Sequence, residues 1–171
     1  AAMLKPAGLL CREETMSVIT KKSTRLRDQE RARLIWLLTT HKALTVSLLG
    51  ELTLAEQVDT DALTSDLSEV RALVSHLPPP DLADTLEGLP VEERHALWRI
   101  VEDEKRGKIL LEASVSVWED LDEEMRDKAL LNALETLDID EQIWLVQHLP
   151  RNLTGRFLAT LPAAGPSRSY Q

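Results

Sequence analysis

Several residue types that stabilise other classes of protein are scarce in this sequence. Its 171 residues contain one cysteine, six glycines, one tyrosine and one phenylalanine. A single cysteine excludes a disulfide within the chain and is typical of a reducing compartment. Few glycines and few aromatic rings, beside abundant leucine, alanine and glutamate, favour helices over strands. The composition therefore predicts an all-α protein.

Long hydrophobic runs are also missing. No apolar stretch approaches the roughly 18 residues that a membrane-spanning helix needs. The first residues of the chain, up to Cys11, are too few and too weakly apolar to form a signal peptide. We therefore expect a soluble, cytoplasmic chain.

Motifs for catalysis are absent as well. The sequence has no nucleophile motif, no glycine-rich phosphate loop and no dinucleotide fingerprint. The histidines are widely separated and show no zinc-ligand spacing with Cys11. Asp81 and Asp84 lie three residues apart on one predicted helix, but nothing near them in the sequence equips either for acid–base catalysis. The sequence does not predict an enzyme.

The net charge of −9 is unevenly distributed along the chain. Residues 1–50 carry nine Lys and Arg against four Asp and Glu, a balance of +5, whereas residues 51–171 carry eleven against twenty-five, a balance of −14. The acidic part repels phosphate backbones, so nucleic acid is not an expected partner. It attracts cations or a basic partner surface, unless it is simply a well-solvated surface.

What the sequence does have is a repeat of twelve residues across residues 77–162. Every twelfth residue from Leu77 onward is apolar, and a proline follows four of these positions. The eight positions, called anchors below, are Leu77, Leu89, Val101, Ala113, Met125, Leu137, Leu149 and Leu161. The residues eight and nine positions after each anchor are apolar in six of seven cases. A fixed period with fixed apolar columns is typical of repeat architectures.

Each repeat has room for one short helix of about ten residues, or roughly 15 Å. Proline suits the first helical turn, because the N–H that it lacks would have no partner there. Helices this short are marginal alone in water, so neighbouring helices must hold them. We therefore expect a superhelix, a solenoid-like array of short helices in which each unit contacts mainly the next. The predicted helices lie near residues 80–88, 91–100, 103–112, 115–122, 124–136, 139–148 and 151–160.

The repeat divides the chain into four parts. Residues 1–23 are expected to be a disordered or added leader, residues 24–76 N-terminal helices, residues 77–162 the array, and residues 163–171 a disordered tail. Residues 24–51 are helical in pattern, with a possible bend at Thr39 and Thr40, and one helix is expected over residues 61–76.

The first of these N-terminal helices is basic. It can contact a membrane surface or an acidic partner, pack near the acidic body, or be solvated. The four tryptophans, Trp36, Trp98, Trp118 and Trp144, are expected to pack in the core or between helices.

The first repeats resemble a known family. The run Leu-Pro-Pro-Pro-Asp-Leu-Ala-Asp at residues 77–84, and the run Leu-Pro-Val-Glu-Glu-Arg at residues 89–94, are similar to the N-terminal cytoplasmic domain of the MgtE magnesium transporter family. The similarity continues through residues 105–112 and 137–141 and ends near Pro162. It covers about half of the chain.

The resemblance implies a superhelix of short helices on the cytoplasmic side of a membrane. In the family this domain precedes a paired CBS domain and a transmembrane channel domain, and the full-length transporter is expected to be a homodimer. Mg2+ ions bound between the acidic surfaces of the two cytoplasmic domains draw them together and close the pore. The implied cofactor is therefore weakly bound Mg2+, shared with a CBS domain of the same parent protein. The resemblance implies that the chain meets a membrane only through this parent protein. Mg2+ takes oxygen ligands and keeps several waters, so a few carboxylates suffice.

The resemblance assigns two metal positions, Asp140 and Glu141, at the start of the helix that follows Leu137. Two further acidic positions of the family pattern are altered, since Trp144 replaces an aspartate and Lys108 replaces a glutamate with a residue of opposite charge. In the alternative interpretation, Asp140 and Glu141 only stabilise the helix dipole. The chain would then be a helical-repeat scaffold that binds another protein without sensing metal.

Overall fold

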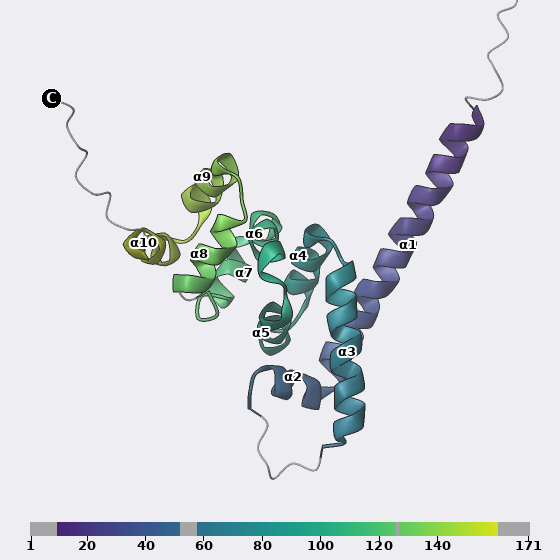
Figure 1. Ribbon diagram of the computed structural model, residues 1–171, viewed down its shortest axis with the longest axis horizontal. Coiled ribbons are helices and arrows are strands. Elements are labelled where there is room, and N and C mark those ends of the chain that lie inside the picture. The colour runs from purple at the N-terminus through teal and green to yellow at the C-terminus, as the bar shows by residue number, and fades with distance from the viewer. Residues whose placement is uncertain (1–9, 52–57, 126, 161–171) are drawn as a thin grey trace, which may run out of the picture.

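Ten helices and no strand make up the part of the chain that the computed structural model describes, which is residues 10–51, 58–125 and 127–160. The helices are α1 (Leu10–Thr40), α2 (Lys42–Leu48), α3 (Thr60–His76), α4 (Pro79–Gly88), α5 (Val91–Ile100), α6 (Asp103–Glu112), α7 (Val115–Asp120), α8 (Asp127–Glu135), α9 (Ile139–His148) and α10 (Arg151–Thr160). The all-α prediction is confirmed. The short helices α4 to α10 follow one another across the molecule, which is compatible with a solenoid-like superhelix (Figure 1).

The twelve-residue period marks the places where the short helices end. All seven anchors within the described residues are buried, with at most 7% of the residue exposed. Leu77, Leu89, Val101, Ala113 and Leu149 each occupy the C-cap position of a helix in an extended backbone conformation. The extended residue ends one helix and turns its side chain into the core. The next helix then begins within two residues of it.

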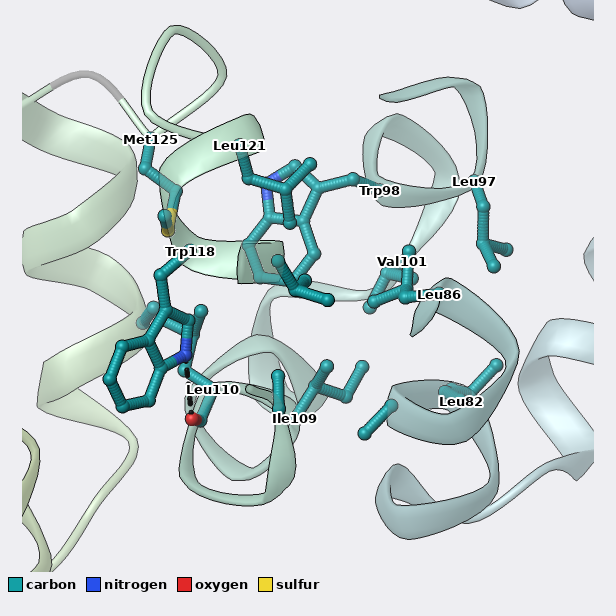
Figure 2. Packing of buried hydrophobic residues seen from close by; sticks show 14 of the residues in the cluster. Leu82, Leu86, Leu97, Trp98, Val101, Ile109, Leu110, Trp118, Leu121 and Met125 are labelled. Carbon is teal, nitrogen blue, oxygen red and sulfur yellow. Dashed lines mark hydrogen bonds between the residues drawn. The ribbon is translucent and has the colours of Figure 1, made fainter. Parts of the chain in front are cut away.

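The hydrophobic core runs through the whole array. Figure 2 shows the part of it that lies between α4 and the turn after α7, where the side chains of successive helices point toward one another. Trp98 and Trp118 belong to this core, with 2% and 3% of their surface exposed. Trp36 and Trp144 are 45% and 44% exposed, so these two do not pack in the core.

The closest packing joins each short helix to the next but one. Helices α4 and α6, α6 and α8, and α8 and α10 make the most extensive contacts within the array, while α5 packs mainly on α2. The expectation that each short helix contacts mainly the next one is therefore wrong for α4, α6 and α8, which pack most closely on the next helix but one. Gly107 shows how near α6 lies to α8, because a Cβ atom built there would be 2.3 Å from the carbonyl oxygen of Ala133.

A column of polar side chains completes the helix ends. Five side chains located five residues after an anchor donate a hydrogen bond to the carbonyl oxygen eight residues earlier, near the end of the preceding helix. The pairs are Arg94 to Leu86 (2.7 Å), Arg106 to Trp98 (3.1 Å), Trp118 to Leu110 (3.0 Å, dashed in Figure 2), Gln142 to Leu134 (2.9 Å) and Thr154 to Val146 (3.3 Å). These carbonyls lie in the last turn of their helices, where the regular helix offers no partner, and each side-chain bond contributes about 1 kcal/mol. Those of Leu86, Trp98 and Leu134 also accept a hydrogen bond from the backbone N–H three residues later. We call these five residues the donor column.

The N-terminal segment differs from its prediction. Residues 10–23 belong to α1 rather than to a disordered leader. The expected bend is confirmed, since α1 ends at Thr40 and α2 begins at Lys42. The C-terminal half of α1 packs into the core through Leu34, Leu37 and Leu38, which are at most 1% exposed. The expected disordered tail, residues 163–171, and the eighth anchor lie outside the described residues.

Candidate functional site

The two residues assigned to metal binding lie at the start of α9. Asp138 is the N-cap of this helix, and its carboxylate accepts a hydrogen bond from the backbone N–H of Glu141 at 2.9 Å. In return, one carboxylate oxygen of Glu141 accepts a hydrogen bond from the backbone N–H of Asp138 at 3.2 Å. An aspartate followed three residues later by a glutamate is the sequence signature of this capping box. The box fixes the position of the Glu141 side chain.

The other carboxylate oxygen of Glu141 forms an ion pair with Lys108 of α6. The Glu141 side chain is 27% exposed and that of Lys108 is 47% exposed. Both oxygens of Glu141 are therefore occupied by partners from the protein itself. Lys108 therefore places an ammonium group against this carboxylate.

Asp140 is placed differently from its neighbour. Its side chain is exposed, and among the described residues it has no hydrogen-bond or ion-pair partner. Together with Leu111, Glu141 and Trp144 it lines an open depression between α6 and α9. Within residues 10–51, 58–125 and 127–160 there is no group of three or more His, Cys, Asp or Glu side chains that could hold a metal ion. Asp140 can thus offer one free carboxylate, and the remaining ligands of an ion would have to come from water or from another surface.

Comparison with protein families identifies the array. Residues 77–166 match the family model for the MgtE intracellular N domain, and this match covers helices α4 to α10 and just over half of the chain. The chain belongs to the MgtE N domain family. No curated protein and no solved structure matches it. The family is a domain of transporters rather than of enzymes.

In this MgtE N domain, the Asp-Leu-Ala-Asp run of α4 faces the basic helix α1. Arg27 lies 3.7 Å from a carboxylate oxygen of Asp81, and Arg31 lies 3.7 Å from one of Asp84. The two residues between these aspartates, at positions 82 and 83, are buried in the core. The two middle residues of this run therefore pack α4 into the core, and the two aspartates that flank them face the arginines of α1. Of the roles weighed for the basic helix, packing near the acidic body is the one that these contacts show.

A second contact between α1 and the acidic part joins Arg33 to Glu69 of α3. The guanidinium donates two hydrogen bonds to the carboxylate, at 2.7 and 3.1 Å. The hydrogen bond from Arg33 lowers the pKa of Glu69 below its ordinary value, and the same bond raises the pKa of Arg33. Both groups are well exposed, so the pair fixes the register of α1 on α3 more than it stabilises the fold.

A charged cluster lies around Glu124, in the turn between α7 and α8. Arg99 of α5 donates two hydrogen bonds to this carboxylate, at 3.0 and 2.9 Å, and His95 lies 3.5 Å away. The hydrogen bond from Arg99 lowers the pKa of Glu124 below its ordinary value of 4.5. Arg99 also donates to the carbonyl oxygen of Leu49 at 2.7 Å, so the cluster connects the N-terminal helices to the middle of the array.

Sequence reasoning did not foresee the partners of the acidic residues. Lys108 and Glu141 are 33 positions apart, and Arg99 and Glu124 are 25 positions apart. Such pairs depend on which helices pack together, and the period predicts where helices end but not which of them meet.

Among the described residues, no helix is both long enough and apolar enough to cross a membrane.

Proposed function

We propose that this chain is the regulatory N-terminal domain of a magnesium transporter of the MgtE family and contributes acidic side chains to Mg2+-dependent gating. The match of residues 77–166 to the family carries this proposal, because the matched residues coincide with the array of short helices. In this proposal the domain lies at the cytoplasmic face of the membrane, beside a CBS domain of the same polypeptide, in a homodimeric transporter.

Asp140 is the carboxylate best placed to meet a Mg2+ ion. It is exposed, has no partner among the described residues, and lies in the first turn of α9, where it would face a neighbouring domain. Mg2+ is usually held by one or two carboxylates and several waters, so Asp140 could act with oxygen ligands from the CBS domain. Glu141 would join them only if the ion displaced the ammonium of Lys108. The proposed site is therefore weak and shared.

The test is Mg2+ uptake by the full-length transporter in proteoliposomes, measured against the Mg2+ concentration on the cytoplasmic side. Asp140→Asn removes the free charge and should raise the concentration of Mg2+ that half-closes the pore. Glu104→Gln is the matched control, because Glu104 is also an exposed carboxylate in the first turn of a short helix. Equal inhibition in the wild type and in the Asp140 variant would contradict the proposal.

A second candidate function is a protein-interaction scaffold without metal sensing. The Lys108–Glu141 ion pair favours it, as does the exposed apolar side of α9, where Ile139, Ile143 and Trp144 are 73%, 51% and 44% exposed. The two functions differ in one measurement, the thermal stability of the N and CBS domains in one polypeptide against Mg2+ concentration. A saturable rise that is lost when Asp140→Asn and Glu141→Gln are combined supports gating, since a ligand of the folded state stabilises it. No rise supports the scaffold.

A further inference from the structure

Helix α1 extends well beyond the body of the molecule (Figure 1). From Met16 to Leu26 every side chain is exposed, whereas Leu34, Leu37 and Leu38 further along the same helix are buried. We call residues 16–26 the α1 arm. Isolated helices of about this length are marginal in water, and no hydrogen bond or ion pair joins the arm to a described residue outside α1. It therefore has the properties of a segment that a partner stabilises.

The α1 arm combines positive charge with apolar side chains. It contains Lys21, Lys22 and Arg25 and no acidic residue. Met16, Ile19 and Leu26 are 65%, 58% and 56% exposed. With 3.6 residues per turn, these three apolar residues fall on one side of the helix, and the three basic residues centre about a third of a turn away. A fourth exposed apolar residue, Val18, falls among the basic residues. A helix with one apolar and one basic side is typical of segments that lie on membrane surfaces.

We propose that the α1 arm binds the surface of an anionic lipid bilayer. The helix would lie parallel to the surface, with Met16, Ile19 and Leu26 at the boundary of the acyl chains and the basic side chains among the headgroups. An anionic bilayer offers hydrocarbon and negative charge side by side over the roughly 16 Å that the arm spans. Each basic residue close to such a surface strengthens binding by about fivefold.

Two observations disfavour a second copy of the chain as the partner. The acidic residues next to α1 are already paired within the chain, since Arg27 and Arg31 face Asp81 and Asp84. A pair of α1 arms would also bring like charges together, and Ser23 interrupts the apolar seam that a coiled coil needs.

The direction of α1 is consistent with a membrane partner. Residues 51–171 carry a balance of −14, and an anionic bilayer would repel them. Because the arm projects from the body, its basic residues can reach the surface while the acidic helices stay away from it (Figure 1).

The experiment is flotation of the 171-residue chain with vesicles of phosphatidylcholine alone, or of equal parts phosphatidylcholine and phosphatidylserine. We expect binding to the anionic vesicles only. Replacing Lys21, Lys22 and Arg25 together by glutamate should weaken it by at least about a hundredfold. Ile19→Ser combined with Leu26→Ser should also weaken it, since the apolar contact is lost. Both multiple variants should keep the thermal midpoint of the wild type, because every side chain of the arm is exposed.

Lys128→Glu is the matched control, since Lys128 is an exposed lysine on α8, far from the arm in the sequence, and its replacement should leave binding unchanged. Equal binding to neutral and anionic vesicles would overturn the proposal, as would binding to neither. A concentration-dependent dimer that the triple charge variant abolishes, without vesicle binding, would assign the arm to a second copy and would equally overturn it.

Discussion

Replacing Gly107 by alanine is the most direct test of how α6 packs on α8. An added Cβ atom would lie 2.3 Å from the carbonyl oxygen of Ala133, 2.6 Å from the hydroxyl oxygen of Thr136 and 3.0 Å from a side-chain carbon of Leu137. The first of these atoms belongs to the backbone of α8, so a rotamer change cannot move it away. The variant can accommodate the new methyl group only if the two helices separate.

The expected magnitude follows from two opposing effects. Alanine gains about 1 kcal/mol over glycine in helix propensity. Overpacking of a close contact costs about 1 to 3 kcal/mol, and a backbone contact places this position at the upper end. In the variant, the new methyl group would also disturb the hydrogen bond that Thr136 donates to the carbonyl oxygen of Ala133 at 2.7 Å. We expect a net loss of about 1 to 2 kcal/mol in the free energy of unfolding, which lowers the thermal midpoint by roughly 2 to 8 °C.

Gly155 provides a matched control within the same chain. It occupies the equivalent position of α10, four repeats later, and nothing lies within 4 Å of its added Cβ atom. Gly155→Ala should therefore show the propensity gain alone and stabilise the chain by about 0.5 to 1 kcal/mol. Urea unfolding followed by circular dichroism measures both changes, provided that the slope m stays constant. If both alanine variants changed stability in the same direction, the close approach of α6 to α8 would be refuted.

Three further predictions concern charged side chains. Arg94→Met removes the hydrogen bond to the carbonyl of Leu86 and leaves the carboxylate of Asp120 without its cation, and it should cost about 2 to 4 kcal/mol in urea unfolding; a loss below about 0.5 kcal/mol would contradict this. Because Arg99 holds the pKa of Glu124 below 4.5, the pair stabilises the fold above pH 4.5, and this contribution is lost as the pH falls below that value. Arg99→Met should therefore flatten the acid limb of the free energy of unfolding plotted against pH. An unchanged limb would contradict a stabilising role of the pair. Lys108→Glu places a further carboxylate beside those of Asp140 and Glu141 and should make the thermal midpoint rise with Mg2+, which the wild-type chain alone should show weakly or not at all; equal midpoints with and without Mg2+ would exclude a latent site there.

The period gave accurate helix boundaries where the signal was local. The helices predicted at residues 91–100, 103–112, 139–148 and 151–160 coincide with α5, α6, α9 and α10. An apolar anchor followed by a residue suited to the first helical turn marks a helix boundary within a few residues, so it can be recognised without knowing the rest of the fold.

The prediction was less accurate where the local signal fades. The helix expected over residues 124–136 begins only at Asp127. The exposure of Trp144 was also missed, because periodicity identifies an apolar residue but not whether another helix covers it. At the site, Asp140 and Glu141 are neighbours in the sequence, but their different environments depend on Lys108, which reaches Glu141 only after α6 and α9 have packed.

The donor column makes the array directional. Five helix ends are completed by a side chain that comes later in the chain, so each of these ends depends on the helix that follows it. Shortening the protein after His148 would leave the carbonyl of Val146 to water, whereas the loss of α4 would leave α5 still bound by Arg106. Thermal fraying and proteolytic trimming should therefore advance from α10 toward α4, and an insertion that separates a unit from its successor should loosen the unit before it.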